Sequence, residues 1–251
     1  MKSLAVIKKE LELASDSDRK VMLHELADDT RTGVKNLILK YKKQEEKYLQ
    51  ELARIEQMKQ FEYEHCDAHY ICGIDEVGRG PLAGPVVAGA VILDRDNDIL
   101  YLNDSKKLSE AKREELYIQI KEKAIACNIG IMPPSVIDDI NILNATYKAM
   151  KQAVEGLSVT PDVLLNDAVI IPDLPMEQVK IIKGDARSIS IAAASILAKV
   201  ERDRMMVEYD KLYPEYGFAH NKGYGSKDHI EALKKYGPCP IHRASFIKNF
   251  V

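Results

Sequence analysis

The sequence lacks the features of a disulfide-stapled or membrane-spanning protein. Its four cysteines form no CxxC pair in 251 residues, so no disulfide framework is indicated and a reducing compartment is expected. The longest apolar runs, Val86–Leu93 and Ile189–Ala198, are too short to cross a bilayer. The opening residues, Met1–Glu10, hold only a four-residue apolar stretch, so we expect no signal peptide. These absences together predict a cytoplasmic protein.

Excess positive charge is also lacking overall, because the net charge is −3. The charge is unevenly distributed, however: residues 1–69 carry 13 Lys and Arg against 14 Asp and Glu, residues 70–182 carry 11 against 17, and residues 183–251 carry 12 against 8. A phosphate-binding surface needs positive charge only locally, and an acidic region beside it suits divalent cations. With 46% hydrophobic residues, the chain can bury one substantial core and a small appendage.

The first 68 residues have a helical pattern. Leu4, Ile7 and Leu11 recur at helical spacing, and Ser15–Asp18 indicates a break with a new N-cap. No glycine or proline interrupts Val34–Phe61, which predicts one long amphipathic helix whose lysine-rich face is solvated. We interpret residues 1–68 as a helical extension whose apolar stripe packs on the main domain or on a partner.

From residue 69 onward, strands alternate with helices, which indicates an α/β domain. Short apolar runs predict five strands, at Tyr70–Val77, Pro85–Leu93, Asn128–Met132, Val163–Asp167 and Val179–Lys183. Helical spacing predicts three helices, at Asp104–Ala126, Ser135–Leu157 and Ser188–Asp210. Turns and short helices follow, so residues from about 206 to 251 form a helical C-terminal part. No internal repeat or low-complexity segment is present.

Four carboxylates lie at the ends of predicted strands or just beyond them: Asp75, Glu76, Asp167 and Asp185. Neighbouring strand residues point to opposite faces, so Asp75 and Glu76 can serve one site only where the strand ends or bends. Converging acids repel one another unless cations neutralise them, and hard oxygen ligands favour Mg²⁺ or Mn²⁺. Each acid alone is more typical of a turn or a helix cap, but the four together favour a metal site.

The segment Gly78–Gly84 is a glycine-rich turn with glycines at positions 78, 80 and 84. It is one residue too long for the dinucleotide-binding GxGxxG pattern, and an apolar strand follows it where a helix should begin. A better use of these glycines is close approach of the backbone to a sugar–phosphate chain, with Arg79 supplying positive charge. Tyr224, between Gly223 and Gly225, is poorly explained as a core residue and suits stacking on a base or sugar.

Several blocks in order resemble the ribonuclease HII family. They are GIDEVGRGPLAGPVVAGAVIL (73–93), NDSKKLS (103–109), KGDARSISIAAASILAKVERDRM (183–205), YPEYGF (213–218), NKGYG (221–225) and GPCPIHRASF (237–246). The resemblance covers about residues 70–250 and is highly specific. It implies a ribonuclease H-like fold, a mixed β-sheet flanked by helices, with residues 69–251 as the catalytic domain.

The same resemblance implies cleavage of the RNA strand in RNA–DNA hybrids and in duplex DNA carrying ribonucleotides, leaving 5′-phosphate and 3′-hydroxyl ends. It makes Asp75, Glu76, Asp167 and Asp185 the catalytic ligands of two Mn²⁺ or Mg²⁺ ions. The implied substrate-binding residues are Gly78, Arg79, Gly80, Asn103, Ser105, Lys106 and Tyr224. This sequence departs from the usual pattern at Asn166, Arg187 and Ser226, none of which is a ligand.

The sequence leaves three rival interpretations open. The sister family ribonuclease HIII shares the chemistry but lacks the Gly-Arg-Gly motif and carries a sheet-containing N-terminal domain. A non-catalytic nucleic-acid-binding module would have lost its acids, whereas all four are present. A zinc site built from His65, Cys66, His69 and Cys72 lacks the usual two-arm spacing. We expect His220, His229 and His242 to make capping or core hydrogen bonds.

Overall fold

The computed structural model describes residues 2–250, and its contacts divide the chain into two compact units that meet between Arg54 and Ile55. The first unit contains α1 (Leu4–Leu13), α2 (Asp16–Glu25) and most of α3 (Thr32–Met58). The Ser15 hydroxyl accepts a hydrogen bond from the Asp18 N–H, so the predicted N-cap is present. The buried core of this unit consists of apolar residues from α1 and α3, namely Ile7, Leu11, Val34, Leu37 and Ile38.

The predicted uninterrupted helix Val34–Phe61 is wrong near its end. Helix α3 stops at Met58, Lys59 adopts a turn with φ −81° and ψ 0°, and α4 (Gln60–Glu64) follows. Ile55 and Met58 pack into the core of the second unit. Packing therefore begins the second unit about fourteen residues before the boundary expected from the sequence.

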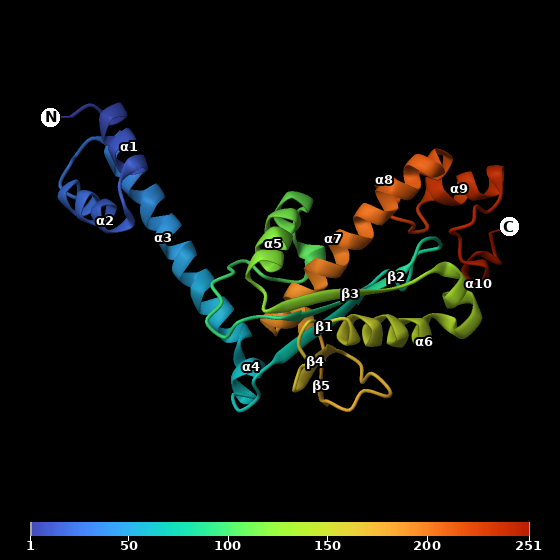
Figure 1. Ribbon diagram of the computed structural model, residues 1–251. Helices are drawn as coiled ribbons and strands as arrows, with labels where there is room; N and C mark the ends of the chain where they lie inside the picture. The colour runs from blue at the N-terminus through green and yellow to red at the C-terminus, as the bar shows by residue number, and fades with distance from the viewer. Residues whose placement is uncertain (1, 251) are drawn as a thin grey trace. The chain divides into compact units, whose positions relative to one another are not determined.

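The second unit is built on a five-stranded sheet (Figure 1). Its strands, in the spatial order β3-β2-β1-β4-β5, are β1 (Ile71–Val77), β2 (Val86–Ile92), β3 (Ala126–Met132), β4 (Val163–Asp167) and β5 (Glu177–Ile181). Strands β3, β2 and β1 pair antiparallel, whereas β1, β4 and β5 pair parallel. The sheet is therefore mixed, and the carboxyl ends of its three parallel strands meet at one edge.

Helices cover both faces of the sheet. On β2, Ala88 and Ala90 face α6 (Pro134–Glu155), whereas Val91 faces α7 (Ile189–Leu212) and α5 (Glu110–Lys123). Helix α7 lies very close to the sheet, because a Cβ on Gly89 would come within 2.5 Å of the Ala194 carbonyl oxygen. The alanine-rich first half of α7 and the glycines beneath it thus allow a long helix to cross the centre of the sheet.

Two features differ from the sequence expectation or extend it. The helix predicted from Asp104 begins only at Glu110, because Ser109 provides the N-cap and Ser105–Lys107 forms a short 3-10 turn. The C-terminal part contains α8 (Phe218–Asn221), α9 (Lys227–Tyr236) and α10 (Ala244–Ile247), packed around a separate apolar cluster. Within residues 2–250, no helix is long and apolar enough to span a bilayer.

Candidate active site

The predicted acids lie at the edge where the parallel strands end. The pairing of β1 with β4 stops at Ile74 and Asn166, so Asp75 and Glu76 are the first residues of β1 beyond it. Asp167 is the last residue of β4, and Asp185 lies in a 3-10 turn just after β5. The Gly184 N–H donates a 2.7 Å hydrogen bond to Asp167 Oδ1, which ties the two turns together. Carboxyl ends of parallel strands are where α/β sheets commonly place their ligands.

Burial and the charges of neighbouring acids make three of these carboxylates, those of Asp75, Glu76 and Asp185, unusually basic. The Asp75 side chain is buried, and this burial raises its pKa well above the usual value, with further increases from the charges of Glu76 and Asp167. Burial is also the main cause that raises the pKa of Glu76 and of Asp185, and the charge of Asp167 adds to both. The acids therefore share one electrostatic environment, in which a nearby cation would favour the ionised form of each.

Two basic side chains partly offset this negative charge. Arg79 Nη1 lies 3.3 Å from Glu76 Oε1. Burial alone would lower the pKa of Lys106, but the carboxylates of Asp75, Asp104 and Asp185 raise it above its usual value. Because Lys106 responds to acids from two separate segments, the segment after residue 102 borders the same site.

Among the four acids of the candidate site, one buried carboxylate oxygen is left without a partner. Glu76 Oε2 is inaccessible to solvent and accepts no hydrogen bond within the described chain, which is costly unless another ligand satisfies it. Residues 2–250 contain no three Asp, Glu, His or Cys side chains already grouped to hold an ion. The donor set thus fits a hard divalent cation in chemistry, and binding one requires these side chains to turn toward a common point.

The segment Asn103–Lys106 is anchored beside the acids by its own side chains. Asn103 Oδ1 accepts from the Asp104 N–H at 2.9 Å, and Asp104 Oδ1 accepts from the Lys106 N–H at 2.9 Å. Ser105 is buried, and its hydroxyl lies 3.0 Å from the Ser195 hydroxyl on α7. Asp104 was missed by sequence reasoning, although its charge also raises the pKa of Asp185.

The glycine-rich loop and the Tyr224 loop lie against each other. The N–H groups of Leu82 and Ala83 both donate to the Gly223 carbonyl oxygen, at 2.8 and 3.3 Å. Tyr224 is 44% exposed, and the Arg202 guanidinium lies 6.0 Å from the centre of its ring. The structure therefore brings the predicted stacking residue next to the loop that begins with Gly78.

The two glycines of the Gly-Arg-Gly motif are required by the fold to different degrees. Gly78 has φ +90°, and a Cβ there would approach Arg202 Nε to 2.3 Å, so the fold itself requires glycine. Gly80 has no positive φ, and a Cβ there would meet nothing within 4 Å. The protein alone gives no reason for glycine at position 80, which is what a backbone reserved for close contact with a ligand would show.

Comparison with known proteins agrees with this arrangement. The sequence model described as Ribonuclease HII matches residues 72–249, and the one described as Ribonuclease HII N-terminal domain matches residues 3–66. The chain belongs to the ribonuclease HII family. Its relatives include the ribonuclease HII of Lachnoclostridium phytofermentans, 59% identical over 98% of this chain and 97% of that protein. The ribonuclease HII of Clostridioides difficile is 51% identical over 100% of this chain and 99% of that protein.

Solved structures show the same fold. The crystal structure of ribonuclease H2 from Pyrococcus horikoshii is similar to this chain with a TM-score of 0.59 and 29% identity, covering 70% of this chain and 93% of that one. Ribonuclease HII enzymes are endoribonucleases that cut the RNA strand of RNA–DNA hybrids, so the chain is a hydrolase acting on such hybrids. The predicted ribonuclease H-like mixed sheet is confirmed.

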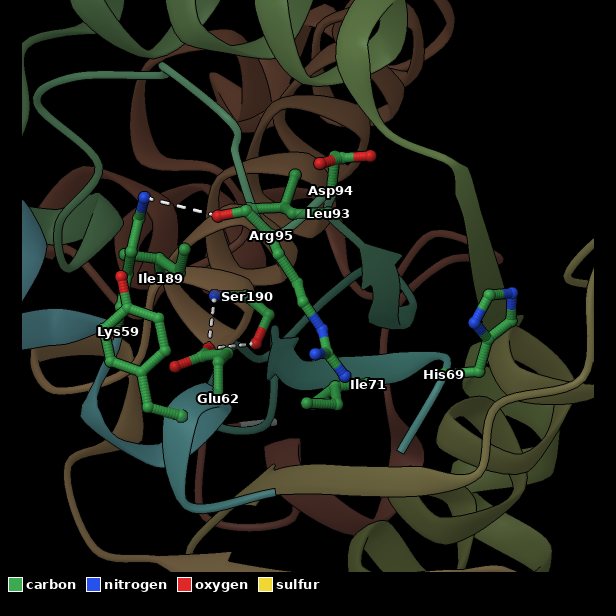
Figure 2. A pocket seen from close by; sticks show the side chains of 10 residues that line it. Lys59, Glu62, His69, Ile71, Leu93, Asp94, Arg95, Ile189 and Ser190 are labelled. Carbon is green, nitrogen blue, oxygen red and sulfur yellow. Dashed lines mark hydrogen bonds between the residues drawn. The ribbon is translucent and has the colours of Figure 1, made fainter. Parts of the chain in front are cut away.

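The start of α7 is capped by a residue far upstream that sequence reasoning missed. Glu62 Oε1 accepts from the Ser188 hydroxyl at 2.7 Å. It also accepts from the N–H and the hydroxyl of Ser190, at 3.2 and 2.5 Å (Figure 2). Ser188 lies three residues after Asp185, so this cap holds the segment that carries an active-site acid. The amphipathic pattern around Glu62 gave no signal, because a glutamate near a helix end is ordinarily solvent-facing.

Proposed function

We propose that this chain cleaves the RNA strand of hybrids, and duplex DNA containing a single ribonucleotide, with two divalent cations held by Asp75, Glu76, Asp167 and Asp185. The observation that carries the proposal is the buried, mutually repelling set of acids at one sheet edge, with Glu76 Oε2 lacking any partner. Oxygen-only ligands favour Mn²⁺ or Mg²⁺ over zinc. The cleavage is proposed to lie on the 5′ side of the ribonucleotide, leaving 5′-phosphate and 3′-hydroxyl ends.

Other residues near the acids are proposed to bind the substrate. When bound, two such cations would activate the attacking water and stabilise the leaving oxygen. Lys106 and Arg79 supply positive charge for the phosphates beside the acids. We infer that the exposed backbone of Arg79 and Gly80 hydrogen-bonds a ribose 2′-hydroxyl. We infer further that the exposed ring of Tyr224 packs on the next sugar, which fits best when it lacks that hydroxyl.

The test uses end-labelled duplexes with zero, one or many ribonucleotides, incubated with Mg²⁺, Mn²⁺ or EDTA. We expect cleavage of the second and third substrates with either metal, none of the first, and none in EDTA. Product mapping should place the cut 5′ to the lone ribonucleotide. Activity that survives EDTA would contradict the metal assignment, and binding without cleavage under all conditions would favour the non-catalytic alternative.

A further inference from the structure

Two arginines outside the proposed metal site are completely buried. Arg202 on α7 and Arg243 before α10 are each 0% exposed, and within the described residues neither lies within 4.0 Å of a carboxylate oxygen. Burial lowers the pKa of Arg243 to about 9, with the charge of Arg202 as the second cause, so Arg243 is charged at neutral pH. Arg202 is charged as well, because a guanidinium group keeps its proton in proteins. Burying a charge without an oppositely charged partner costs free energy of folding. The fold nevertheless keeps two such charges here.

All the hydrogen bonds of these guanidinium groups go to backbone carbonyls, mainly of the loop that follows β1. Arg243 donates to the carbonyl oxygens of Arg79 at 2.9 Å, Gly78 at 2.5 Å and Gly84 at 2.8 and 2.9 Å. Arg202 donates to the carbonyl oxygens of Pro85 at 2.9 Å and Ala83 at 3.2 Å. Five of the eight carbonyls in the segment 78–85 are therefore held from the inside.

Because the arginines hold these carbonyl groups on the buried side of the loop, the N–H groups of the same peptides point outward. In a trans peptide, the C=O and the following N–H point in opposite directions. Holding the carbonyls of Gly78 and Arg79 inward therefore points the N–H groups of Arg79 and Gly80 away from Arg243. Both residues are exposed, and in the described part of the chain neither N–H donates to another group. Two unused donors thus face the solvent where a ribose would lie.

Arg202 also hydrogen-bonds the second loop, which carries Tyr224. Its Nη1 donates to the Lys222 carbonyl oxygen at 2.9 Å, and its guanidinium lies beside the Tyr224 ring. The backbone of Arg243 also holds the loop that follows β1, because its N–H donates to the Leu82 carbonyl oxygen at 2.9 Å. The Arg202 side chain therefore links the two loops proposed to contact adjacent sugars, and the Arg243 side chain holds the first of them.

We propose that Arg202 and Arg243 are positioning residues that hold the Arg79 and Gly80 amides and the Tyr224 ring in register across a ribonucleotide–deoxyribonucleotide junction. This inference rests on the proposed reading of single ribonucleotides. Neither arginine touches the substrate, since both are wholly buried beneath the loops. The planar fork of arginine is needed because lysine offers one charged nitrogen and cannot hold two or three carbonyls in a fixed plane.

The test compares wild type with Arg243→Lys and Arg202→Lys, which keep the charge but lose the fork. Rates are measured on a single-ribonucleotide duplex and an all-RNA hybrid, and amide hydrogen exchange is measured without substrate. We expect kcat/KM on the single-ribonucleotide duplex to fall about 10–100-fold, as for a misplacement of about 1 Å. The all-RNA hybrid, which needs no deoxyribose beside the cut, should lose less. Exchange at Leu82, Ala83 and Gly84 should accelerate while that of β3 stays unchanged.

Arg204→Lys is the matched control, because Arg204 lies on the same helix but is exposed and pairs with Glu114; it should keep wild-type rates and exchange. Wild-type exchange and an unchanged ratio between the two substrates in both buried variants would overturn the proposal. If wild type does not cut the lone ribonucleotide, junction reading itself fails, and faster exchange in the loop still distinguishes a clamp from an inert core residue. If a variant melts before assay, measurements are made below its midpoint, where β3 exchange verifies folding.

Discussion

At the residue scale, the acids are better suited to a cation than to the protein alone. Asp75 is buried beside Glu76, and both the burial and the charge of Glu76 make its ionised form unfavourable. The pKa of Asp75 is raised for this reason. Sequence reasoning could identify these residues because each lies at or near the carboxyl end of a predicted strand or just beyond it. It could not identify Arg202 or Arg243, because an arginine that binds carbonyls has no distinctive spacing in the chain.

Replacing Asp75 with asparagine should separate catalysis from folding. Losing a metal ligand is expected to reduce cleavage by more than about 100-fold, since outer-shell changes alone cost 10–100-fold. The melting temperature in EDTA should stay the same or rise, because a buried repelling charge is removed. Cleavage assays and thermal melts measure both. Near-normal turnover would remove Asp75 from the proposed site, and a large drop in melting temperature would assign it a structural role.

Gly78 and Gly80 offer a paired test of fold against function. Gly78→Ala should destabilise the protein by roughly 1–3 kcal/mol, because φ is +90° and the new Cβ would clash with Arg202. Gly80→Ala should change stability by less than about 0.5 kcal/mol, yet reduce cleavage by about 10–100-fold because the methyl group holds the ribose away. Chemical denaturation and rates on both substrates measure this. Full activity in Gly80→Ala would exclude close ribose contact at that residue.

At the element scale, a chain of hydrogen bonds ties α9 to the segment before α10. His242 Nδ1 accepts from the Cys239 N–H at 3.0 Å, so its Nε2 carries the proton donated to His229 Nε2 at 3.0 Å. His229 Nδ1 then donates to the Tyr224 carbonyl oxygen at 2.8 Å. The relay requires both rings to be neutral, and a second proton on either ring would set two N–H groups against each other. The expectation of core hydrogen bonds for these two histidines is confirmed.

This relay predicts a loss of stability in acid. Burial lowers the pKa of His229, and burial followed by the charge of His229 lowers the pKa of His242 to about 4. A histidine with a lowered pKa contributes stability above its unfolded value near 6.5, and that contribution is lost as pH falls toward 4. For His242 it is on the order of 3 kcal/mol.

The buried acids have raised pKa values, so their contribution to stability changes with pH in the opposite direction. The effect of the histidines is therefore measured as the difference in stability between wild type and a histidine variant at each pH. Urea midpoints of wild type and His242→Gln, each in EDTA at pH 7.5, 6 and 4.5, should lie far apart at the highest pH and converge at the lowest. His24→Gln, an exposed position in α2, is the control and should follow wild type at every pH. A constant gap between wild type and His242→Gln across this range would show that protonation does not break the relay.

Element boundaries mark where sequence reasoning succeeded and failed. Hydrophobic periodicity correctly indicated all five strands and the long helices on both faces of the sheet. It misplaced the start of α5 because both Asp104 and Ser109 are good caps, and only the packing of Ser105 against Ser195 decides between them. It also missed the turn at Lys59, since nothing in that segment breaks a helix locally.

At the scale of the whole molecule, the contacts that define the site join residues far apart in sequence. Arg202 meets the carbonyl of Pro85, 117 residues away, and Glu62 meets Ser190, 128 residues away. Such pairings depend on how helices and strands stack, and the sequence pattern of either partner alone does not specify them. The acids and the glycine-rich loop could be predicted from the sequence because each lies in a short contiguous block of characteristic residues.

The placement of residues 55–68 changes what truncation should do. From the sequence, the extension ends at residue 68, so a chain starting near His69 would fold and cleave. The structure places Ile55 and Met58 in the core that also contains α7, and Glu62 at the start of α7. Removing them loses the burial of two apolar side chains, about 1.5–3 kcal/mol each, and uncovers the core surface on which they pack. It also leaves Ser188 and Ser190 without their acceptor. The total approaches the entire stability of many domains, about 5–15 kcal/mol.

We therefore expect a chain starting at Leu52 to remain folded and active, and one starting at His69 to be insoluble or to melt far lower. Thermal melts and rates at saturating substrate compare the two with full-length protein. Within the full chain, Glu62→Gln should lower stability by about 1–2 kcal/mol through the loss of a charged cap. Glu64→Gln, an exposed change on the same helix, should have no effect. If the chain from His69 melts and cleaves like the chain from Leu52, residues 55–68 contribute no folding energy to the catalytic unit, and the boundary expected from the sequence is the better one.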